Sequence, residues 1–257
     1  MELENALADG FGLRDVVVVD VPAAPTEHGS DPLARERVAR SAADYLASVR
    51  PHGTIGVSWG RTMLELAGQL RPGWTEASEI VQLNGATSRS ARPTRANEIV
   101  ERFGLTTGAS IRLMAAPAIV GSAELRRALE RDPSVGETLE AARSAPTAIF
   151  GLGVLSFDSV HIESGNLSEM ELAALREAGA VGDVLGRFLA EDGRVAFPEL
   201  DRRTVGLPLE ELARKELAIG LAAGVGRGPI ALAALRARCL NVLVTDEPTA
   251  DWVLDRA

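Results

Sequence analysis

Short apolar segments rich in β-branched residues alternate along this chain with longer segments whose apolar residues recur at helical spacing. Residues 15–20 hold four consecutive valines between two aspartates and predict a buried strand. In residues 32–49, Val38, Ala42 and Leu46 recur every four positions, which predicts a helix. Strands that are apolar on both faces, each followed by a helix, indicate a parallel sheet with helices on both sides.

The same alternation continues through the rest of the sequence, and the fold class is therefore α/β. Further strands are predicted at residues 54–58, 79–83, 110–114, 146–152, 218–223 and 241–245. Further helices are predicted at residues 62–70, 94–103, 122–130, 133–144, 168–178, 208–215, 228–237 and 246–254. Ser168 followed by Glu171 has the spacing of a capping box at a helix start. Residues 22–31, rich in proline and small polar residues, predict a loop.

Composition narrows the classes of function. The chain has 257 residues, of which 46% are hydrophobic and 25% charged, as in ordinary soluble globular domains. Its net charge of −9 counts against a large contact surface for a nucleic-acid backbone. An aromatic content of 4% counts against a base-stacking platform. Cys239 is the only cysteine, which excludes an internal disulfide and a Cys-rich zinc site.

Signals for membranes and metals are weak. The most apolar runs, residues 16–21 and 148–155, fall well below the roughly 20 residues that cross a bilayer. The first residues are acidic, whereas a secretory signal starts with basic residues. We therefore expect a cytoplasmic protein with no membrane partner. His28, His52 and His161 have no second ligand at metal-binding spacing, so neither a metal nor another cofactor is expected.

Glycine-rich segments follow several predicted strands, where ligands bind in parallel sheets. In Gly56-Val-Ser-Trp-Gly-Arg-Thr62 the glycines let an anion approach backbone N–H groups and the next helix N-terminus, and Ser58 and Thr62 add hydroxyl donors. Further segments are Gln82-Leu-Asn-Gly85, Gly151-Leu-Gly153, Gly179-Ala-Val-Gly-Asp183 and Gly224-Val-Gly-Arg-Gly228. Asp183 offers an acceptor for sugar hydroxyls, and Arg227 adds a guanidinium. Together the segments predict a pocket for a small anionic molecule that carries hydroxyl groups.

Other interpretations of these segments stay open from the residues alone. Glycines after strands also form tight turns that bind nothing. The pattern Gly56-x-Ser58-x-Gly60 matches the nucleophile elbow of α/β-hydrolases, which needs an acidic residue and then a histidine after the serine. His161 is the only later histidine, and no motif surrounds it. Lys215, the only lysine, lies outside every glycine segment, which argues against imine chemistry.

In this order, the glycine segments resemble the effector-binding domain of SorC/DeoR-type bacterial transcriptional regulators. Matching segments also include Val81-Gln-Leu-Asn-Gly85, Ala116-Pro-Ala-Ile-Val120, the stretch from Gly224 to Leu235, and Asn241-Val-Leu-Val-Thr-Asp-Glu247. Residues 3–19 resemble the segment that follows the DNA-binding region in such regulators. The resemblance covers nearly the whole chain, so residues 1–257 are expected to form a sugar-binding effector domain.

The resemblance implies a Rossmann-like fold with a mostly parallel sheet and helices on both faces, similar to glucosamine-6-phosphate deaminase and ribose-5-phosphate isomerase. It also implies a phosphorylated sugar as effector, a homo-oligomer (dimer or tetramer), and no catalysis. Carried over by motif, Gly60, Arg61 and Thr62 hold the phosphate with help from Arg227, and Asp183 accepts sugar hydroxyls. The other expected site residues are Gly56, Ser58, Asn84, Gly85, Arg95, Gly151 and Gly153.

Two features depart from the family pattern. Arg227 stands where the family usually has lysine, which keeps the positive charge and permits bidentate contact with phosphate. There is no room for an N-terminal helix-turn-helix before the first strand. We therefore expect an effector domain excised from a longer regulator that binds DNA only through the missing part, and a natural stand-alone protein is the other interpretation. The alternative is a sugar-phosphate isomerase or deaminase. For that chemistry Asp183 offers one acid–base group, and no motif histidine or lysine supplies the other.

Overall fold

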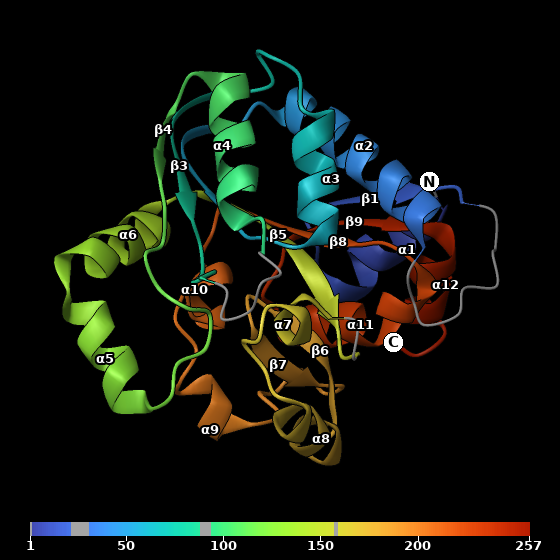
Figure 1. Ribbon diagram of the computed structural model, residues 1–257. Helices are drawn as coiled ribbons and strands as arrows, with labels where there is room; N and C mark the ends of the chain where they lie inside the picture. The colour runs from blue at the N-terminus through green and yellow to red at the C-terminus, as the bar shows by residue number, and fades with distance from the viewer. Residues whose placement is uncertain (1, 22–30, 88–93, 157–158) are drawn as a thin grey trace.

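A mostly parallel sheet crosses the centre of the molecule, and helices cover both of its faces (Figure 1). The computed structural model describes residues 2–21, 31–87, 94–156 and 159–257. The predicted loop at residues 22–31 lies, apart from Asp31, outside the described residues. The predicted α/β fold class is confirmed.

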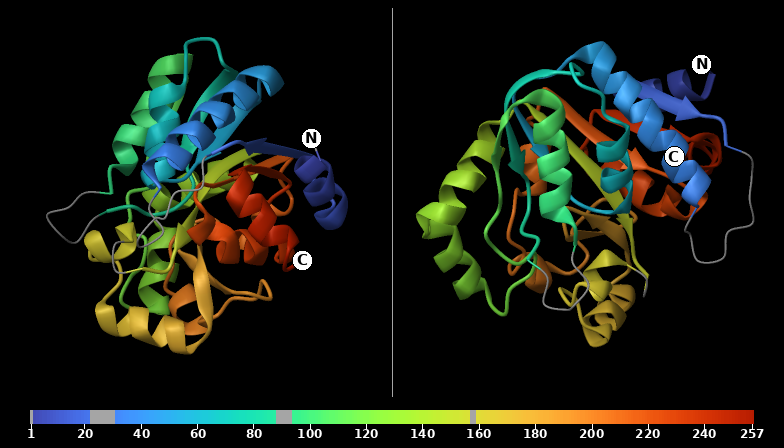
Figure 2. Two further views of the ribbon diagram at one scale, coloured as in Figure 1. Left: turned by 90° about the vertical axis from the view of Figure 1, so that its right-hand side faces the viewer. Right: turned by 45° about the horizontal axis from the view of Figure 1, so that its top comes forward.

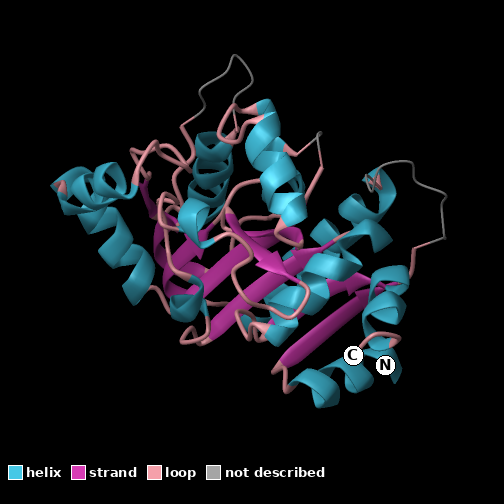
Figure 3. Ribbon diagram, turned by 90° about the horizontal axis from the view of Figure 1, so that it is seen from below, coloured by secondary structure: helices cyan, strands magenta, loops and turns pink. Residues whose placement is uncertain are grey.

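The main sheet of the described chain contains seven parallel strands in the order β1-β9-β8-β5-β2-β3-β4 (Figure 3). In chain order they are β1 (Asp15–Val19), β2 (His52–Val57), β3 (Glu76–Gln82), β4 (Ser110–Arg112), β5 (Thr147–Val154), β8 (Leu217–Ala222) and β9 (Val242–Asp246). Two further strands, β6 (Ala180–Val184) and β7 (Arg187–Ala190), form an antiparallel hairpin that pairs with the end of β5. Because the main strands run in one direction, their carboxyl ends lie along one edge of the sheet.

Alternate residues of each strand face two separate apolar layers, as the twofold repeat of a strand requires. In β5, Ile149 packs in the first layer, whereas Ala148 and Phe150 pack in the second. The first layer is built with α2 (Pro32–Val49), α3 (Arg61–Gln69) and α4 (Ala96–Thr107). The second is built with α1 (Glu2–Phe11), α6 (Pro133–Ser144), α11 (Gly228–Arg236) and α12 (Glu247–Leu254). Figure 2 places α1 and α12, and with them both chain ends, side by side.

Short helices surround the hairpin on the side away from α2 and α3 (Figure 1). They are α7 (Val160–Glu163), α8 (Glu169–Glu177), α9 (Pro198–Asp201) and α10 (Leu209–Leu212), and α5 (Ala123–Arg131) precedes α6. The predicted capping box of α8 is confirmed, since Ser168 Oγ accepts the Glu171 N–H at 3.2 Å and the Glu171 carboxylate accepts the Ser168 N–H at 2.9 Å. The helix predicted at residues 208–215 is shorter than expected and ends at Leu212.

The sequence patterns missed α1 and the β6–β7 hairpin. The hairpin turns at Leu185 and Gly186, whose φ angles are 55° and 78°. A two-residue turn with positive φ at both positions normally contains Asn, Asp or Gly, so a leucine there hides the turn signal. The segment Gly179–Asp183, predicted only as a glycine segment, contributes most of its residues to β6.

Lys215, the only lysine, stabilises the C-terminal end of α6. Its ammonium group is buried and donates hydrogen bonds to the carbonyl oxygens of Ala142 at 2.7 Å, Arg143 at 2.5 Å and Ala145 at 2.8 Å. The last carbonyls of a helix have no partner within the helix, and a cation there also opposes the helix dipole. A single buried ammonium therefore satisfies three backbone acceptors.

We expect Lys215→Met to lower the free energy of unfolding by about 2–3 kcal/mol, because hydrogen bonds to a charged group are lost and buried carbonyls lose their donor. Arg214→Met is the control, since the neighbouring Arg214 side chain is 74% exposed and pairs only with Glu211 among the described residues. Urea unfolding of both variants measures the difference. Equal stability of the two variants would contradict the capping role.

Candidate functional site

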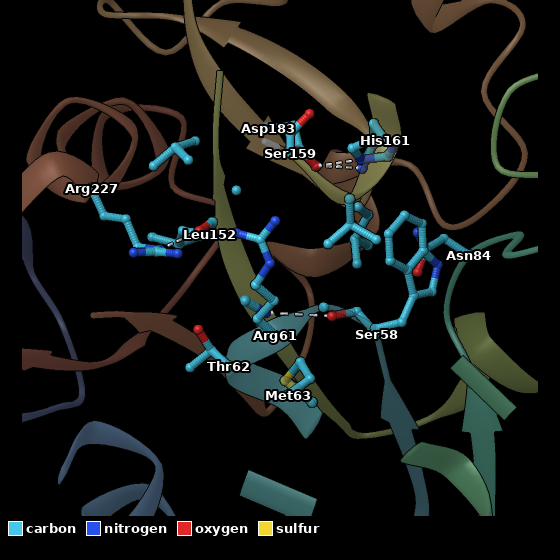
Figure 4. Close-up of a pocket in the computed structure, with 18 residues that line it drawn as sticks. Ser58, Arg61, Thr62, Met63, Asn84, Leu152, Ser159, His161, Asp183 and Arg227 are labelled. Carbon is cyan, nitrogen blue, oxygen red and sulfur yellow. Dashed lines mark hydrogen bonds and ion pairs between the residues drawn. The ribbon is translucent and has the colours of Figure 1, made fainter. Parts of the chain in front are cut away.

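A cavity with an open volume of about 640 Å³ lies where β2, β5 and the β6–β7 hairpin meet (Figure 4). Side chains and glycines from several elements line it: Ser58, Trp59, Gly60, Arg61, Thr62, Met63, Asn84, Gly151, Leu152, Gly153, Val154, Ser159, Val160, His161, Asp183, Leu185, Gly186 and Arg227. The lining has a cationic side and a hydroxyl-accepting side.

The N-terminus of α3 forms one part of the cationic side. The loop after β2 is held in place by Ser58, whose N–H donates to the Ile149 carbonyl at 3.0 Å and whose hydroxyl accepts the Gly151 N–H at 3.4 Å. Gly60 has φ 136° and supplies no side-chain cap to the helix. The backbone N–H groups of this first turn belong to residues that line the cavity, and such groups at a helix N-terminus attract anions. Thr62 adds a buried hydroxyl beside them.

Arg227 is a buried cation on the same side. Its side chain comes from the turn before α11, is 9% exposed, and donates from Nε to the Leu152 carbonyl at 3.2 Å and from Nη1 to the Ala223 carbonyl. Burial and the neighbouring guanidinium groups of Arg35 and Arg61 lower the pKa of Arg227 to about 10. The group is still charged at neutral pH. Nearby carboxylates offset part of this repulsion, and a buried cation beside two other guanidinium groups still favours an anion in the cavity.

Arg61 connects the N-terminus of α3 to α7. Its guanidinium lies 3.4 Å from the carboxylate of Glu163, the last residue of α7. The same short helix brings Val160 and His161 to the cavity, with Ser159 directly before it. The Arg61–Glu163 ion pair therefore joins the cationic side of the cavity to an element that carries part of the opposite side.

The opposite side consists of Asn84, Asp183 and His161. Asp183 Oδ2 accepts the Gly186 N–H at 2.8 Å and lies 3.3 Å from His161 Nε2. In Figure 4, Asp183 and His161 lie near each other, while Arg227 lies on the other side of the cavity. Gly153 leaves room for the carboxylate, because a Cβ there would lie 2.0 Å from Asp183 Oδ1.

Comparison with known proteins identifies the family. A family profile described as "Putative sugar-binding domain" matches residues 1–255. The chain belongs to this family. The sugar-binding domain is 29% identical to the Deoxyribonucleoside regulator of Bacillus subtilis (strain 168) over 249 residues. This match covers 96% of this chain and 78% of that protein. It is 32% identical over 261 residues to the transcriptional regulator LsrR of Enterobacter sp. (strain 638), covering 99% of this chain and 76% of that protein.

Solved structures agree with this assignment. The domain superposes on a DeoR family transcriptional regulator from Listeria monocytogenes with a TM-score of 0.83 and 27% identity, covering 98% of each chain. The resemblance to SorC/DeoR-type regulators is therefore confirmed, and the proteins similar to this domain are named as regulators of transcription. None of the described helices is both long enough and apolar enough to cross a bilayer.

Most of the predicted site residues of the sugar-binding domain meet at the cavity. These are Ser58, Gly60, Arg61, Thr62, Asn84, Gly151, Gly153, Asp183 and Arg227. They come from separate glycine segments; the parallel strands bring most of them to one edge of the sheet, and the antiparallel β6–β7 hairpin brings Asp183. Their roles toward a ligand stay predictions.

Gly56, Gly85 and Arg95 do not line the cavity. The two glycines serve packing instead: a Cβ at Gly56 would lie 2.3 Å from the Leu83 side chain, and a Cβ at Gly85 would lie 2.2 Å from the Pro117 carbonyl oxygen. Arg95 does not reach in, because its exposed guanidinium pairs with Glu98 at 2.6 Å and 2.7 Å. These three residues therefore lie outside the cavity lining, and their roles toward a ligand stay predictions.

His161 is the functional side chain that sequence reasoning missed. It stands alone in the sequence, and only the fold brings it to Asp183. Trp59 was also passed over, although it lies inside a predicted segment; its Nε1 donates to the Gly85 carbonyl at 3.0 Å, and its ring lies 5.0 Å from that of His161. Because His161 contacts Asp183 while Ser58 is bonded to Gly151, the described residues assemble no serine–histidine pair for a hydrolase. They also contain no cluster of three His, Cys, Asp or Glu side chains suited to a metal.

Proposed function

We propose that residues 1–257 form the effector domain of a cytoplasmic transcriptional regulator, and that this domain binds a phosphorylated sugar without converting it. The observation that carries the proposal is the buried Arg227 guanidinium in the wall of the cavity, across from Asp183 and Asn84. One side of such a cavity suits a phosphate, and the other suits hydroxyl groups.

The phosphate is proposed to bind at the N-terminus of α3, between Arg61 and Arg227. Backbone N–H groups and the helix dipole favour a dianion there, and Thr62 adds a hydroxyl donor. Arginine at position 227 can contact two phosphate oxygens at once, which lysine cannot do with the same geometry. The sugar then extends toward Asn84 and Asp183.

Regulation is proposed to follow from the effector's preference for one arrangement of subunits. A ligand shifts a conformational equilibrium only through its different affinity for the two states. A coupling of roughly 1–3 kcal/mol between the effector site and DNA binding is enough for a useful switch. We propose that the intact regulator is a homo-oligomer, a dimer or a tetramer, and that it binds DNA through an N-terminal domain.

A thermal-shift panel tests the effector class. Inorganic phosphate and phosphorylated sugars should raise the melting temperature, and the same sugars without phosphate should do less. A ligand at 100 times its Kd stabilises the folded state by about 2.7 kcal/mol. If unphosphorylated sugars stabilise the domain as well as their phosphates do, the proposed phosphate site is wrong.

One observation favours a second candidate, a sugar-phosphate isomerase or deaminase. The contact between His161 and Asp183 in the cavity supplies the histidine that the sequence motifs lacked for acid–base chemistry. Incubation of the domain with a panel of aldose and ketose phosphates, followed by product analysis, separates the two functions. Turnover near the enzyme median of about 10 per second would favour the enzyme; binding without conversion favours the sensor.

We expect Glu163→Gln to bind inorganic phosphate about 2- to 5-fold more tightly than the wild type at low salt. The variant removes the carboxylate that lies 3.4 Å from the Arg61 guanidinium, so this carboxylate no longer competes with an incoming anion for Arg61. Partly exposed ion pairs contribute up to about 1 kcal/mol, which sets the size of the effect. Glu169→Gln removes an exposed carboxylate from the nearby α8 and is the control. Isothermal titration that finds equal affinity for both variants would exclude this competition.

A further inference from the structure

His161 is held in a fixed orientation at the wall of the cavity. It is 5% exposed, and its ring lies between those of Trp59 and Phe188, with centroid distances of 5.0 Å and 5.7 Å. On one edge of the ring, Nε2 lies 3.3 Å from Asp183 Oδ2. Packing and one polar contact set this orientation, as is usual for a side chain that recognises a ligand.

The contact with Asp183 determines which nitrogen of a neutral His161 carries the proton. A carboxylate only accepts hydrogen bonds, so Nε2 must be the donor in this pair. Nδ1 of the neutral ring is then an acceptor. Among the described residues, this buried nitrogen has no hydrogen-bond partner.

A second buried acceptor in the same wall of the cavity also lacks a hydrogen-bond donor among the described residues. Asn84 is 2% exposed, and its Oδ1 also has no partner within the described part of the chain. Buried acceptors without donors are unfavourable, and native proteins rarely keep them without a reason. Both residues lie across the cavity from Arg227 (Figure 4). A hydroxyl group of a ligand in this cavity is the kind of donor that both acceptors lack.

We propose that His161 is a specificity-determining residue that accepts a hydrogen bond from a hydroxyl of the effector, with Asn84 as a second acceptor. The inference rests on the proposed function and narrows it. The effector is a sugar phosphate that carries a free hydroxyl at the end away from its phosphate, and a deoxy analogue is rejected there. A site built to bond a hydroxyl discriminates strongly against an analogue that lacks it, because its own polar groups are then left unpaired.

Two substitutions of His161 distinguish the role of Nδ1 from that of Nε2. An asparagine side chain places an amide atom where Nδ1 stands, because both are bonded to Cγ, and it loses the contact with Asp183. A glutamine places an amide atom near the position of Nε2 and removes the acceptor at Nδ1. His161→Asn should therefore keep the preference for the hydroxylated ligand, whereas His161→Gln should lose it. His52→Gln, an exposed histidine at the start of β2, is the matched control.

The experiment is isothermal titration with glucose 6-phosphate, fructose 6-phosphate and ribose 5-phosphate, their monodeoxy analogues, and inorganic phosphate. We expect the wild type and His52→Gln to prefer at least one hydroxylated sugar over its deoxy analogue by about 10- to 100-fold, the effect of one unpaired buried acceptor. His161→Gln should reduce that ratio to within about threefold. Unchanged affinity for inorganic phosphate shows that each variant keeps its fold.

Two results would overturn the inference, and they can be told apart. If the wild type binds sugar phosphates without distinguishing any deoxy analogue, or if His161→Gln keeps the wild-type ratio, His161 does not read a hydroxyl, and the proposed effector class stands. If the wild type binds none of the sugar phosphates, the inference fails together with the proposed function.

Discussion

Arg227→Met is expected to weaken the binding of inorganic phosphate and of every phosphorylated sugar by about 30-fold or more. Removing one member of a buried, hydrogen-bonded charge pair costs about 2–5 kcal/mol of binding free energy, and each 1.4 kcal/mol is tenfold. Arg227 is the most deeply buried guanidinium that lines the cavity, so water screens its attraction to an anion least. Isothermal titration of wild type and variant measures the loss.

The control for this prediction is Arg214→Met, which removes one positive charge from an exposed position outside the cavity. It should change phosphate affinity by less than about twofold, because exposed charges are screened by water and salt. Arg227→Lys keeps the charge but loses the two-pronged contact, so its affinity should lie between those of wild type and Arg227→Met. A phosphate affinity of Arg227→Met equal to that of the control would place the anion elsewhere.

The sequence was most informative where parallel strands end. Ser58, Asn84 and Arg227 lie far apart along the chain, yet each follows a parallel strand of one sheet. Parallel strands end at a common edge, so a pattern that fixes strand direction also predicts that these residues meet. The cavity wall confirms that they do.

Residues placed by other geometry were not predictable in this way. His161 follows no strand and belongs to a short helix that the apolar pattern did not reveal, so only the tertiary fold brings it to Asp183. Arg95 was expected at the cavity because its position in the family motif suggested it, but a local ion pair with Glu98 determines the direction of its side chain. Sequence pattern indicates where a backbone runs, whereas the direction of a long charged side chain depends on neighbours.

Glycines were informative for a reason that differs from one position to the next. Gly60 has positive φ and leaves the N-terminus of α3 open. Gly56 and Gly85 make room for close packing beneath the site. All of these positions are glycine in the sequence, and only the backbone angle and the contacts that a Cβ would make distinguish their roles. This distinction leads to a matched pair of variants within one strand.

Gly153→Ala is expected to lower the free energy of unfolding by about 3–5 kcal/mol, the usual cost of breaking a buried charged contact. The added methyl group would lie 2.0 Å from Asp183 Oδ1, so the carboxylate must leave its position. It then loses the hydrogen bond from the Gly186 N–H and the contact with His161, and it has few other places to go because Asp183 is buried. Urea unfolding of the wild type and the variant, fitted with the same folded and unfolded baselines, measures the change in the free energy of unfolding.

Gly151→Ala is the matched control, since Gly151 lies two residues earlier in the same strand and lines the same cavity. A Cβ there would meet only Met63 Cγ, at the ordinary contact distance of 3.8 Å. Its stability should therefore change by less than about 1 kcal/mol. Equal stability of the two alanine variants would mean that Asp183 can move away freely, and that the carboxylate is not held in place to meet a ligand. A large difference, with phosphate binding retained in Gly151→Ala, is the result expected if β5 is shaped around Asp183.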